Sequence, residues 1–297
     1  MECIVAKGLG KRYGSTWGVV DASFQAPGDA VTVLLGPNGA GKTTTVGMLS
    51  TLLKPSKGDA WVGGFHVVRD AWEVRRRIAI VPQEARVDPN WTPWEAVKWY
   101  LVARGWPRRE AERRARWALE ALGLWEARNR TGWALSGGQR RKVVVAMALA
   151  TEAEVVFLDE PTTGLDVESR YSVWNTIRSE ASRGRCIFFT THDMREAEVL
   201  ADHAVLISRG KVVAEGSPTG LKEKLPYRYR VVFRKPRATP TLPEGRLLQL
   251  GDTVIAYAET RAEAIALAGE VEAERVSIEE ASFEDVYLYL VHGGEAQ

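Results

Sequence analysis

Two glycine-rich segments of the sequence have residue types that suit the binding of an anion. The first covers Gly36, Pro37, Asn38, Gly39, Ala40, Gly41, Lys42, Thr43 and Thr44. Its glycines allow backbone N–H groups to turn toward a phosphate, and a helix starting at Lys42 would point the positive end of its dipole there. Lys42 could reach the β and γ phosphates, and the Thr43 hydroxyl could ligate Mg²⁺. We therefore predict a nucleotide site in which Lys42 also takes part in catalysis.

Two carboxylates end the apolar run EVVFLDE at residues 154–160. Asp159 is predicted to hold the Mg²⁺ shell. Glu160 is one residue further and, by strand alternation, should point to the other side. A carboxylate beside a γ phosphate can polarise the attacking water. Glu160 is therefore the predicted general base.

The second glycine-rich segment is LSGGQ at residues 135–139. Ser136 and the amides of Gly137 and Gly138 are expected to cap a helix that begins near Gln139, which makes another anion site. One phosphate loop already has a helix and a lysine of its own. The second site therefore needs a different phosphate, and the question is which one.

The composition of the chain limits the classes of function. The 297 residues are 45% hydrophobic, and 40 basic against 38 acidic side chains leave a formal charge of +2. This balance gives no reason to expect a nucleic-acid partner. The two cysteines are far apart, so we expect no disulfide framework and a reducing compartment. The sequence shows no signal peptide and no apolar run long enough to span a bilayer, so a membrane role would need a partner.

Short apolar runs alternate with helical patterns, which indicates an α/β fold with a largely parallel sheet. The expected buried strands end in polar residues, where open α/β sheets bind ligands. They are residues 30–36, 77–83, 154–160 and 185–192. Residues from about 90 to 135 are read as a helical insertion. We place the first domain at 1–222 and a small α+β domain at 227–297, which opens on a strand with alternating apolar residues.

These motifs together resemble the ATPase subunit of an ATP-binding cassette (ABC) transporter over roughly residues 2 to 220. Six motifs occur in the order of the family. They are Walker A (36–44), Gln83 after a strand, the signature (135–139), Walker B (155–159, then Glu160), the D-loop (164–166) and His192 after another strand. The end of the tail, SFEDVYLYL, is similar to that of the exporter branch pairing with drug, antibiotic or lipid-type permeases.

The resemblance implies a P-loop NTPase fold of ABC type and an answer to the second glycine segment. Two subunits would form a head-to-tail dimer in which the signature of one covers the ATP of the other. It also implies that separate transmembrane permease subunits are driven and that the protein lies at the cytoplasmic face of the cell membrane. The second subunit is expected to be an identical copy, although the sequence leaves a related chain open. ATP and Mg²⁺ are the expected substrate and cofactor.

The resemblance also assigns roles to single residues. Tyr13 would stack on adenine, although Trp17 is a nearby competitor. Gln83 would join Mg²⁺ and the attacking water and link to the membrane partner. His192 would contact the γ phosphate, and Asp166 would lie at the dimer seam.

The same motifs bear on other classes of nucleotide-binding protein. A kinase or GTPase is disfavoured because an N-K-x-D base-reading motif is missing. The main alternative is a soluble ABC ATPase acting on ribosomes or DNA, and a non-hydrolysing ATP sensor is disfavoured by Glu160. We further expect residues 83–106, with their aromatic side chains, to form the groove for a helix of the membrane subunit.

Overall fold

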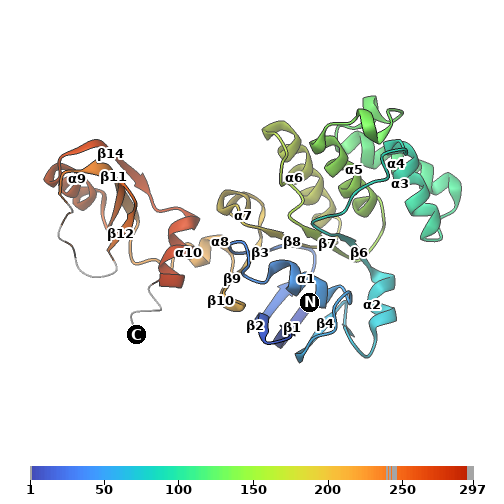
Figure 1. Ribbon diagram of the computed structural model, residues 1–297, viewed down its shortest axis with the longest axis horizontal. Coiled ribbons are helices and arrows are strands. Elements are labelled where there is room, and N and C mark those ends of the chain that lie inside the picture. Colours follow the sequence, from blue (N-terminus) through green and yellow to red (C-terminus); the bar gives the residue numbers. More distant parts are fainter. Residues whose placement is uncertain (1, 239, 241, 243–245, 293–297) are drawn as a thin grey trace. The chain divides into compact units, whose positions relative to one another are not determined.

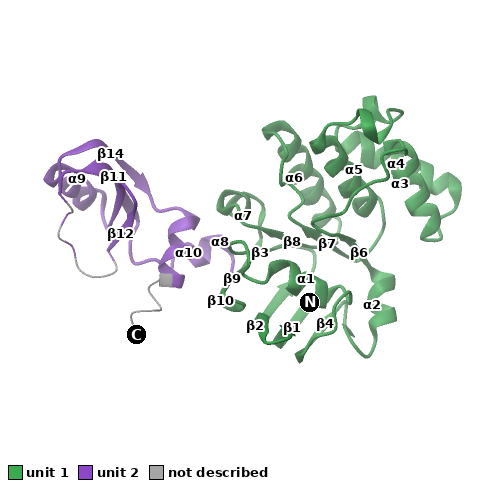
Figure 2. Ribbon diagram, viewed as in Figure 1, with its two compact units in different colours: residues 1–215 green, residues 216–297 purple. Residues whose placement is uncertain are grey.

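The computed structural model describes residues 2–238, 240, 242 and 246–292 (Figure 1). The chain divides into two compact units, residues 1–215 and residues 216–297 (Figure 2). Helix α8 (Pro218–Lys222) belongs to the second unit because it contacts helix α10 (Phe283–His292). The two units therefore divide after residue 215, a few residues before the domain limit of 222 expected from the sequence. The domain bounds 1–222 and 227–297 stay a prediction.

Unit 1 is built on a ten-stranded sheet with the order β5-β4-β1-β2-β10-β9-β3-β8-β7-β6. The strands from β9 to β6 run parallel, whereas β1, β2, β4 and β5 pair antiparallel. The strands are β1 (Glu2–Tyr13), β2 (Thr16–Pro27), β3 (Val31–Leu35), β4 (Lys57–Val62), β5 (Phe65–His66), β6 (Ile78–Val81), β7 (Val155–Asp159), β8 (Cys186–Thr191), β9 (His203–Ser208) and β10 (Lys211–Gly216).

Helices fill the long connection between β6 and β7, and Figure 1 shows α3, α4 and α5 gathered as one helical group. The helices of unit 1 are α1 (Lys42–Leu49), α2 (Ala71–Arg77), α3 (Pro93–Ala103), α4 (Arg108–Ala121), α5 (Gly137–Leu149), α6 (Val167–Ala181) and α7 (Met194–Leu200), with short 3₁₀ turns at Trp125–Ala127 and Gly132–Ala134. The predicted α/β class with a helical insertion is confirmed.

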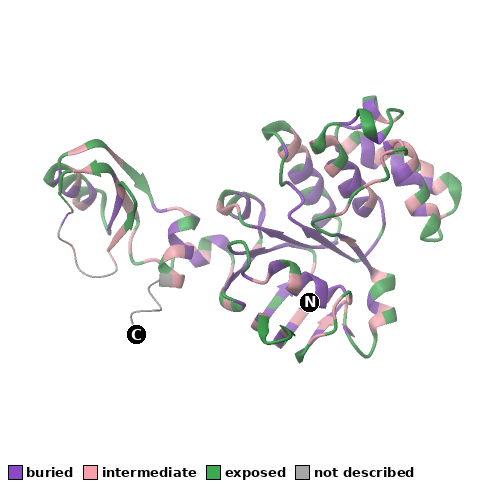
Figure 3. Ribbon diagram, in the orientation of Figure 1, coloured by how far each residue is buried: buried purple, intermediate pink, exposed green. Residues whose placement is uncertain are grey.

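The central parallel strands are buried throughout, as Figure 3 shows for β3, β7 and β8. Their sequences, VTVLL, VVFLD and CIFFTT, are nearly continuous apolar runs, the pattern of strands covered on both faces. Parallel strands expose their carboxyl ends at one edge of the sheet. Polar residues that follow β3, β6, β7 and β8 are therefore brought to the same edge.

The expectation of no disulfide is wrong for this structure. Cys3 of β1 and Cys186 of β8 form a disulfide, with Cα atoms 6.5 Å apart across a sequence separation of 183 residues. Cys186 is buried in the core shared by the antiparallel and parallel strands, where Phe24 of β2 stacks on Phe188 of β8, and half-buried Cys3 packs against that core. Sequence distance hid this pairing, because only the packing of the antiparallel strands over the parallel ones brings Cys3 and Cys186 together.

Unit 2 contains a four-stranded antiparallel sheet with the order β12-β13-β11-β14. Its elements are α8, β11 (Tyr229–Pro236), β12 (Leu247–Leu250), β13 (Thr253–Ala258), α9 (Arg261–Glu270), β14 (Ala273–Glu280) and α10. The alternation predicted for the opening strand is confirmed, since Val231 and Phe233 are buried while Arg234 is exposed.

Helix α10 is joined to the sheet of unit 2 by a buried carboxylate. Asp285 is completely buried and lies 3.2 Å from Nη1 of Arg230, on β11. It also accepts hydrogen bonds from the hydroxyls of Tyr257 (2.9 Å) and Ser282 (2.7 Å). Burial raises the pKa of Tyr257, and the charge of Asp285 raises it further. The segment SFEDVYLYL is thus tied to the sheet of unit 2 through Asp285.

Candidate active site

The loop between β3 and α1 forms one wall of a pocket of about 270 Å³. Its lining residues are Gly18, Asn38, Gly39, Gly41, Lys42, Thr43, Thr44, Gln83 and Glu160. Gly36 sits so close to β9 that an added Cβ would lie 2.2 Å from the carbonyl oxygen of Ile207. Gly41, the N-cap of α1, has φ of 105°, a conformation that favours glycine. These two glycines let the backbone line the pocket.

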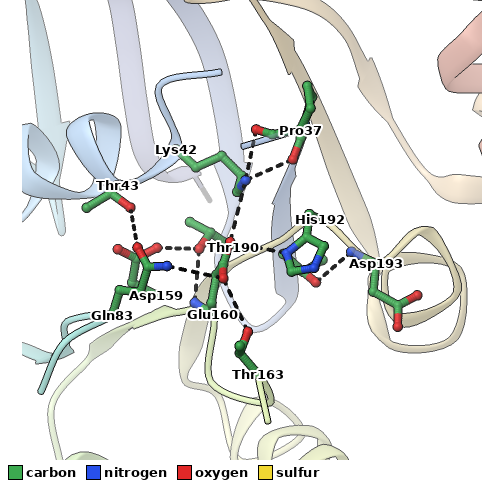
Figure 4. Close-up of polar contacts among 12 residues, drawn as sticks. Pro37, Lys42, Thr43, Gln83, Asp159, Glu160, Thr163, Thr190, His192 and Asp193 are labelled. Atoms are coloured by element: carbon green, nitrogen blue, oxygen red, sulfur yellow. Dashed lines mark hydrogen bonds and ion pairs between the residues drawn. The ribbon is translucent and has the colours of Figure 1, made fainter. Parts of the chain in front are cut away.

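Lys42 directs its ammonium group toward the carboxyl edge of the sheet (Figure 4). The side chain is only 6% exposed, and Nζ donates to the carbonyl oxygens of Gly36 (2.8 Å) and Pro37 (3.1 Å). Burial lowers the pKa of Lys42, while the neighbouring charge of Glu160 raises it. A buried ammonium that lines a pocket is a strong attractor for an anion.

Glu160 connects three of the residues predicted to act in the site, Lys42, Gln83 and His192, and also contacts Thr163. Its carboxylate lies 3.6 Å from Nζ of Lys42 and 3.3 Å from Nδ1 of His192, and it accepts from Gln83 (3.4 Å) and Thr163 (3.2 Å) (Figure 4). The residue is buried and has φ of 49°, a left-handed conformation that is strained for glutamate. This left-handed conformation turns the chain after β7, and the carboxylate of Glu160 lines the pocket.

The three predicted magnesium ligands lie at the same edge. The Thr43 hydroxyl donates to Oε1 of Gln83 at 3.4 Å, and Asp159 accepts from the Thr190 hydroxyl at 2.5 Å. Hydroxyl, amide and carboxylate oxygens are the donors that Mg²⁺ prefers. Among the described residues, no group of three or more His, Cys, Asp or Glu side chains is placed to hold a metal. Because Mg²⁺ is commonly bound through one or two protein oxygens together with substrate phosphates, this donor set suits an ion that shares its coordination with phosphate oxygens.

The remaining predicted site residues lie outside this cluster. Tyr13 is 49% exposed, and a Cβ added at Gly18, a pocket residue, would lie 2.9 Å from its ring. Ser136 is the N-cap of α5: it accepts from the Gln139 amide at 3.1 Å, and the Gln139 side chain accepts in return from the Ser136 amide. Asp166 caps α6 by accepting from the Ser169 amide at 2.7 Å. Neither Ser136 nor Asp166 lines the pocket of its own chain.

Sequence reasoning missed Glu196, which organises the back of the site. This carboxylate on α7 is 2% exposed and accepts hydrogen bonds from the hydroxyls of Thr162 (2.6 Å) and Thr191 (2.6 Å) and from the Trp174 indole (2.7 Å). It thereby ties the segment after Glu160 to the residue before His192. Sequence alone indicates only a solvated charge on a short helix, because its three partners come from separate elements.

Comparison with known proteins places this geometry in a family. The family model for ABC transporters matches residues 19–163. The daunorubicin resistance ATP-binding protein DrrA3 of Streptomyces coeruleorubidus is 36% identical over 300 residues, which cover 97% of this chain and 95% of that protein. The chain belongs to the ABC transporter ATP-binding family. The predicted family is therefore confirmed.

Other relatives of this ABC protein carry names from export and drug resistance. The daunorubicin/doxorubicin resistance ATP-binding protein DrrA of Streptomyces peucetius is 40% identical, covering 75% of this chain and 68% of that one. The Nod factor export ATP-binding protein I of Ralstonia nicotianae is 38% identical, covering 71% and 66%. Among solved structures, an ATP-binding subunit of an ABC transporter is 25% identical with a TM-score of 0.68, covering 75% and 92%.

A second solved structure, CbiO1 of Clostridium perfringens, described as part of the transporter complex CbiONQ, has a TM-score of 0.66 at 25% identity, covering 75% and 91%. The P-loop NTPase fold of ABC type is thus confirmed, and this ABC protein is an ATP-binding protein. In the part of the chain that the structure describes, no helix combines the length and apolar character needed to cross a membrane.

The left-handed glycine of the phosphate loop provides a test of the pocket. A Cβ added at Gly41 would lie 2.7 Å from the carbonyl oxygen of Gly18, in addition to the strain of its φ. We expect Gly41→Ala to weaken binding of a fluorescent ATP analogue by roughly tenfold to a hundredfold, the equivalent of about 1–3 kcal/mol of strain. Gly64→Ala is the matched control, because Gly64 has φ of 82° but no neighbour within 4 Å of an added Cβ. Equal affinities for the two variants would contradict this account of the loop.

Proposed function

We propose that this ABC protein binds ATP with Mg²⁺, hydrolyses it, and so drives export through separate membrane subunits. The observation that carries the proposal is the position of Glu160, whose carboxylate faces the pocket between the ammonium of Lys42 and the ring of His192. A general base must lie within reach of a water beside the γ phosphate. The buried carboxylate next to the phosphate-loop lysine meets that requirement.

The residues support a direct attack of water on ATP. As the water oxygen bonds to the γ phosphorus, Glu160 accepts the water proton, and the bond from phosphorus to the β–γ bridging oxygen breaks. Lys42 and the amides of the loop stabilise the charge on the phosphate oxygens. Thr43, Gln83 and Asp159 would hold Mg²⁺, which neutralises phosphate charge when bound. His192, 3.3 Å from Glu160, would orient the carboxylate and contact the γ phosphate.

Lys42 is also the means by which the nucleotide changes the site. Its ammonium contacts Glu160 at 3.6 Å, and a phosphate oxygen would compete for the same protons. Because both side chains are buried, neither charge is readily satisfied by bulk water. Binding of the γ phosphate therefore draws Lys42 away from Glu160 and leaves the carboxylate available to the attacking water.

The exposed N-terminus of α5 supports pairing of two identical chains, head to tail. Ser136 and Gly137 are exposed at the N-terminus of α5, and the pocket of the same chain is lined by other residues. Across a twofold axis, this anion site would cover the γ phosphate held by the partner. Tyr13 would stack on adenine, and exposed Asp166 would lie at the seam between the subunits.

Export and a membrane partner are supported by the relatives named for drug resistance and Nod factor export. Trp91, which precedes α3, and Trp99, in the middle of α3, are exposed and lie in the segment 83–106 that we propose as the groove for a membrane-subunit helix. The protein would then lie at the cytoplasmic face of the cell membrane, held there by the permease.

The general base is tested by Glu160→Gln. The amide keeps the size of the side chain but cannot accept the water proton, so hydrolysis should fall by about 10²–10⁴-fold. ATP binding should persist, and a nucleotide-bound dimer should accumulate in size-exclusion chromatography with Mg²⁺ and ATP. Turnover at the wild-type rate would remove Glu160 from the mechanism.

The shared site is tested by mixing Ser136→Ala with Lys42→Ala. Each variant alone damages both composite sites, whereas a mixed dimer keeps one site with an intact lysine and an intact serine. Random mixing should restore about a quarter of wild-type hydrolysis, since roughly half the dimers hold one of two sites intact. A mixture no more active than its components, or full activity of each variant alone, would contradict the head-to-tail arrangement.

The transport role is tested by what the protein retains during mild purification from its own cells. We expect a tagged chain to copurify with an integral membrane protein after detergent extraction. Variants in the segment 83–106, such as Trp91→Ala, should no longer copurify with it. Tagged Trp72→Ala, an exposed tryptophan outside that segment, is the control. Retention of ribosomes or DNA in place of a membrane protein would favour the soluble alternative.

A further inference from the structure

Arg141 joins two loops of the active site through their backbones. Its Nη1 donates to the carbonyl oxygens of Pro82 (3.1 Å) and Gln83 (3.0 Å), and its Nη2 donates to those of Asp159 (2.6 Å) and Glu160 (3.1 Å). Two adjacent nitrogens of one planar guanidinium thus serve two pairs of carbonyls. Only arginine has this rigid fork of donors.

The contacts lie where the sheet stops holding these segments together. Strands β6 and β7 pair in parallel, and their register ends at Val81 opposite Leu158. Pro82 follows β6 and Asp159 is the last residue of β7, so the guanidinium continues the connection beyond the paired residues of the two strands. Burial lowers the pKa of Arg141, while the charges of Asp159 and Glu160 raise it. A guanidinium remains charged in proteins, so its bonds to the carbonyls are charge-assisted.

The side chains that matter for catalysis are held only loosely to each other. Gln83 Nε2 and Glu160 Oε2 are 3.4 Å apart, and so are Thr43 Oγ1 and Gln83 Oε1. Their relative position must therefore come from the backbone, and Glu160 has the strained φ of 49°. A misplacement of about 1 Å can cost about a hundredfold in rate.

We propose that Arg141 is a positioning residue that fixes Gln83 and Glu160 relative to each other and to the signature helix α5. The inference rests on the proposed function, because Glu160 must be the general base for its position to matter. Arg141 lies five residues after Ser136 on the same helix. The helix that presents the anion site for the partner thus also sets the geometry of the chain's own base.

Arg114 is a matched control within the same unit. Its guanidinium also donates to three backbone carbonyls, those of Leu149, Ala150 and Thr151, and burial lowers its pKa as well. These contacts join α4 to the end of α5, and neither Arg114 nor its partners line the pocket. A loss of general stability should therefore appear in both Arg114→Gln and Arg141→Gln, and a loss of positioning only in the second.

The test compares steady-state hydrolysis, affinity for an ATP analogue and melting temperature in these two variants. We expect Arg141→Gln to lower kcat at least tenfold with the analogue Kd changed less than threefold, and Arg114→Gln to keep kcat within twofold at a similar melting temperature. Arg141→Lys, which retains the charge but not the fork, should also lose kcat; it replaces the glutamine variant if that one does not fold. Wild-type kcat in Arg141→Lys and Arg141→Gln would overturn the proposal.

A double-mutant cycle separates an effect of Arg141 that acts through Glu160 from an effect on the rate that is independent of Glu160. In the Glu160→Gln background, Arg141→Gln should lower the residual rate by less than twofold, because Arg141 acts through Glu160. An equal tenfold loss in both backgrounds would overturn the proposal while leaving Glu160 as the base. If Glu160→Gln itself hydrolysed at the wild-type rate, the proposed function would fail first, so the two failures are distinguishable.

Discussion

The site depends on holding the positive charge of Lys42 and the negative charge of Glu160 together, both buried, at the carboxyl edge of a parallel sheet. Lys42 follows β3 and Glu160 follows β7, with β8 between these strands in the sheet. Both side chains are buried, and removing two charges from water is costly unless they are paired and hydrogen-bonded. The carbonyls of the phosphate loop, the strained turn at Glu160 and the hydroxyl of Thr163 all serve this requirement. The rest of unit 1 provides the rigid strands on which it can be met.

Local features of the site were readable in the sequence because each motif is contiguous. The segment from Gly36 to Thr44 follows β3 and runs into α1, as predicted. Ser136 caps α5, and the Gln139 side chain accepts a hydrogen bond from the Ser136 amide in the reciprocal half of the capping box. Apolar runs identified β3, β6, β7 and β8, and parallel strands bring the residues after them to one edge. The proximity of Lys42, Gln83, Glu160 and His192 follows from that rule alone.

Features that join distant segments were not readable in this way. The disulfide between Cys3 and Cys186, the three hydrogen bonds to Glu196 and the four from Arg141 all link elements whose spacing carries no pattern. A polar residue on a helix reads as solvated unless its tertiary partners are known, because burial of a charge depends on the groups opposite it. The same reason hid Asp285, a buried acid in a sequence that reads as an amphipathic helix.

Asp285 has a practical consequence for any shortened or tagged form of the protein. Truncation before α10 would remove the carboxylate that contacts Arg230 and Tyr257 and would uncover the apolar surface now covered by Phe283 and Val286. Arg230 would keep its ion pair with Glu279, a carboxylate of β14 that is 44% exposed. Removing the last helix would therefore disrupt unit 2. Shortened forms should retain the chain through α10, and fusion partners are best attached after it.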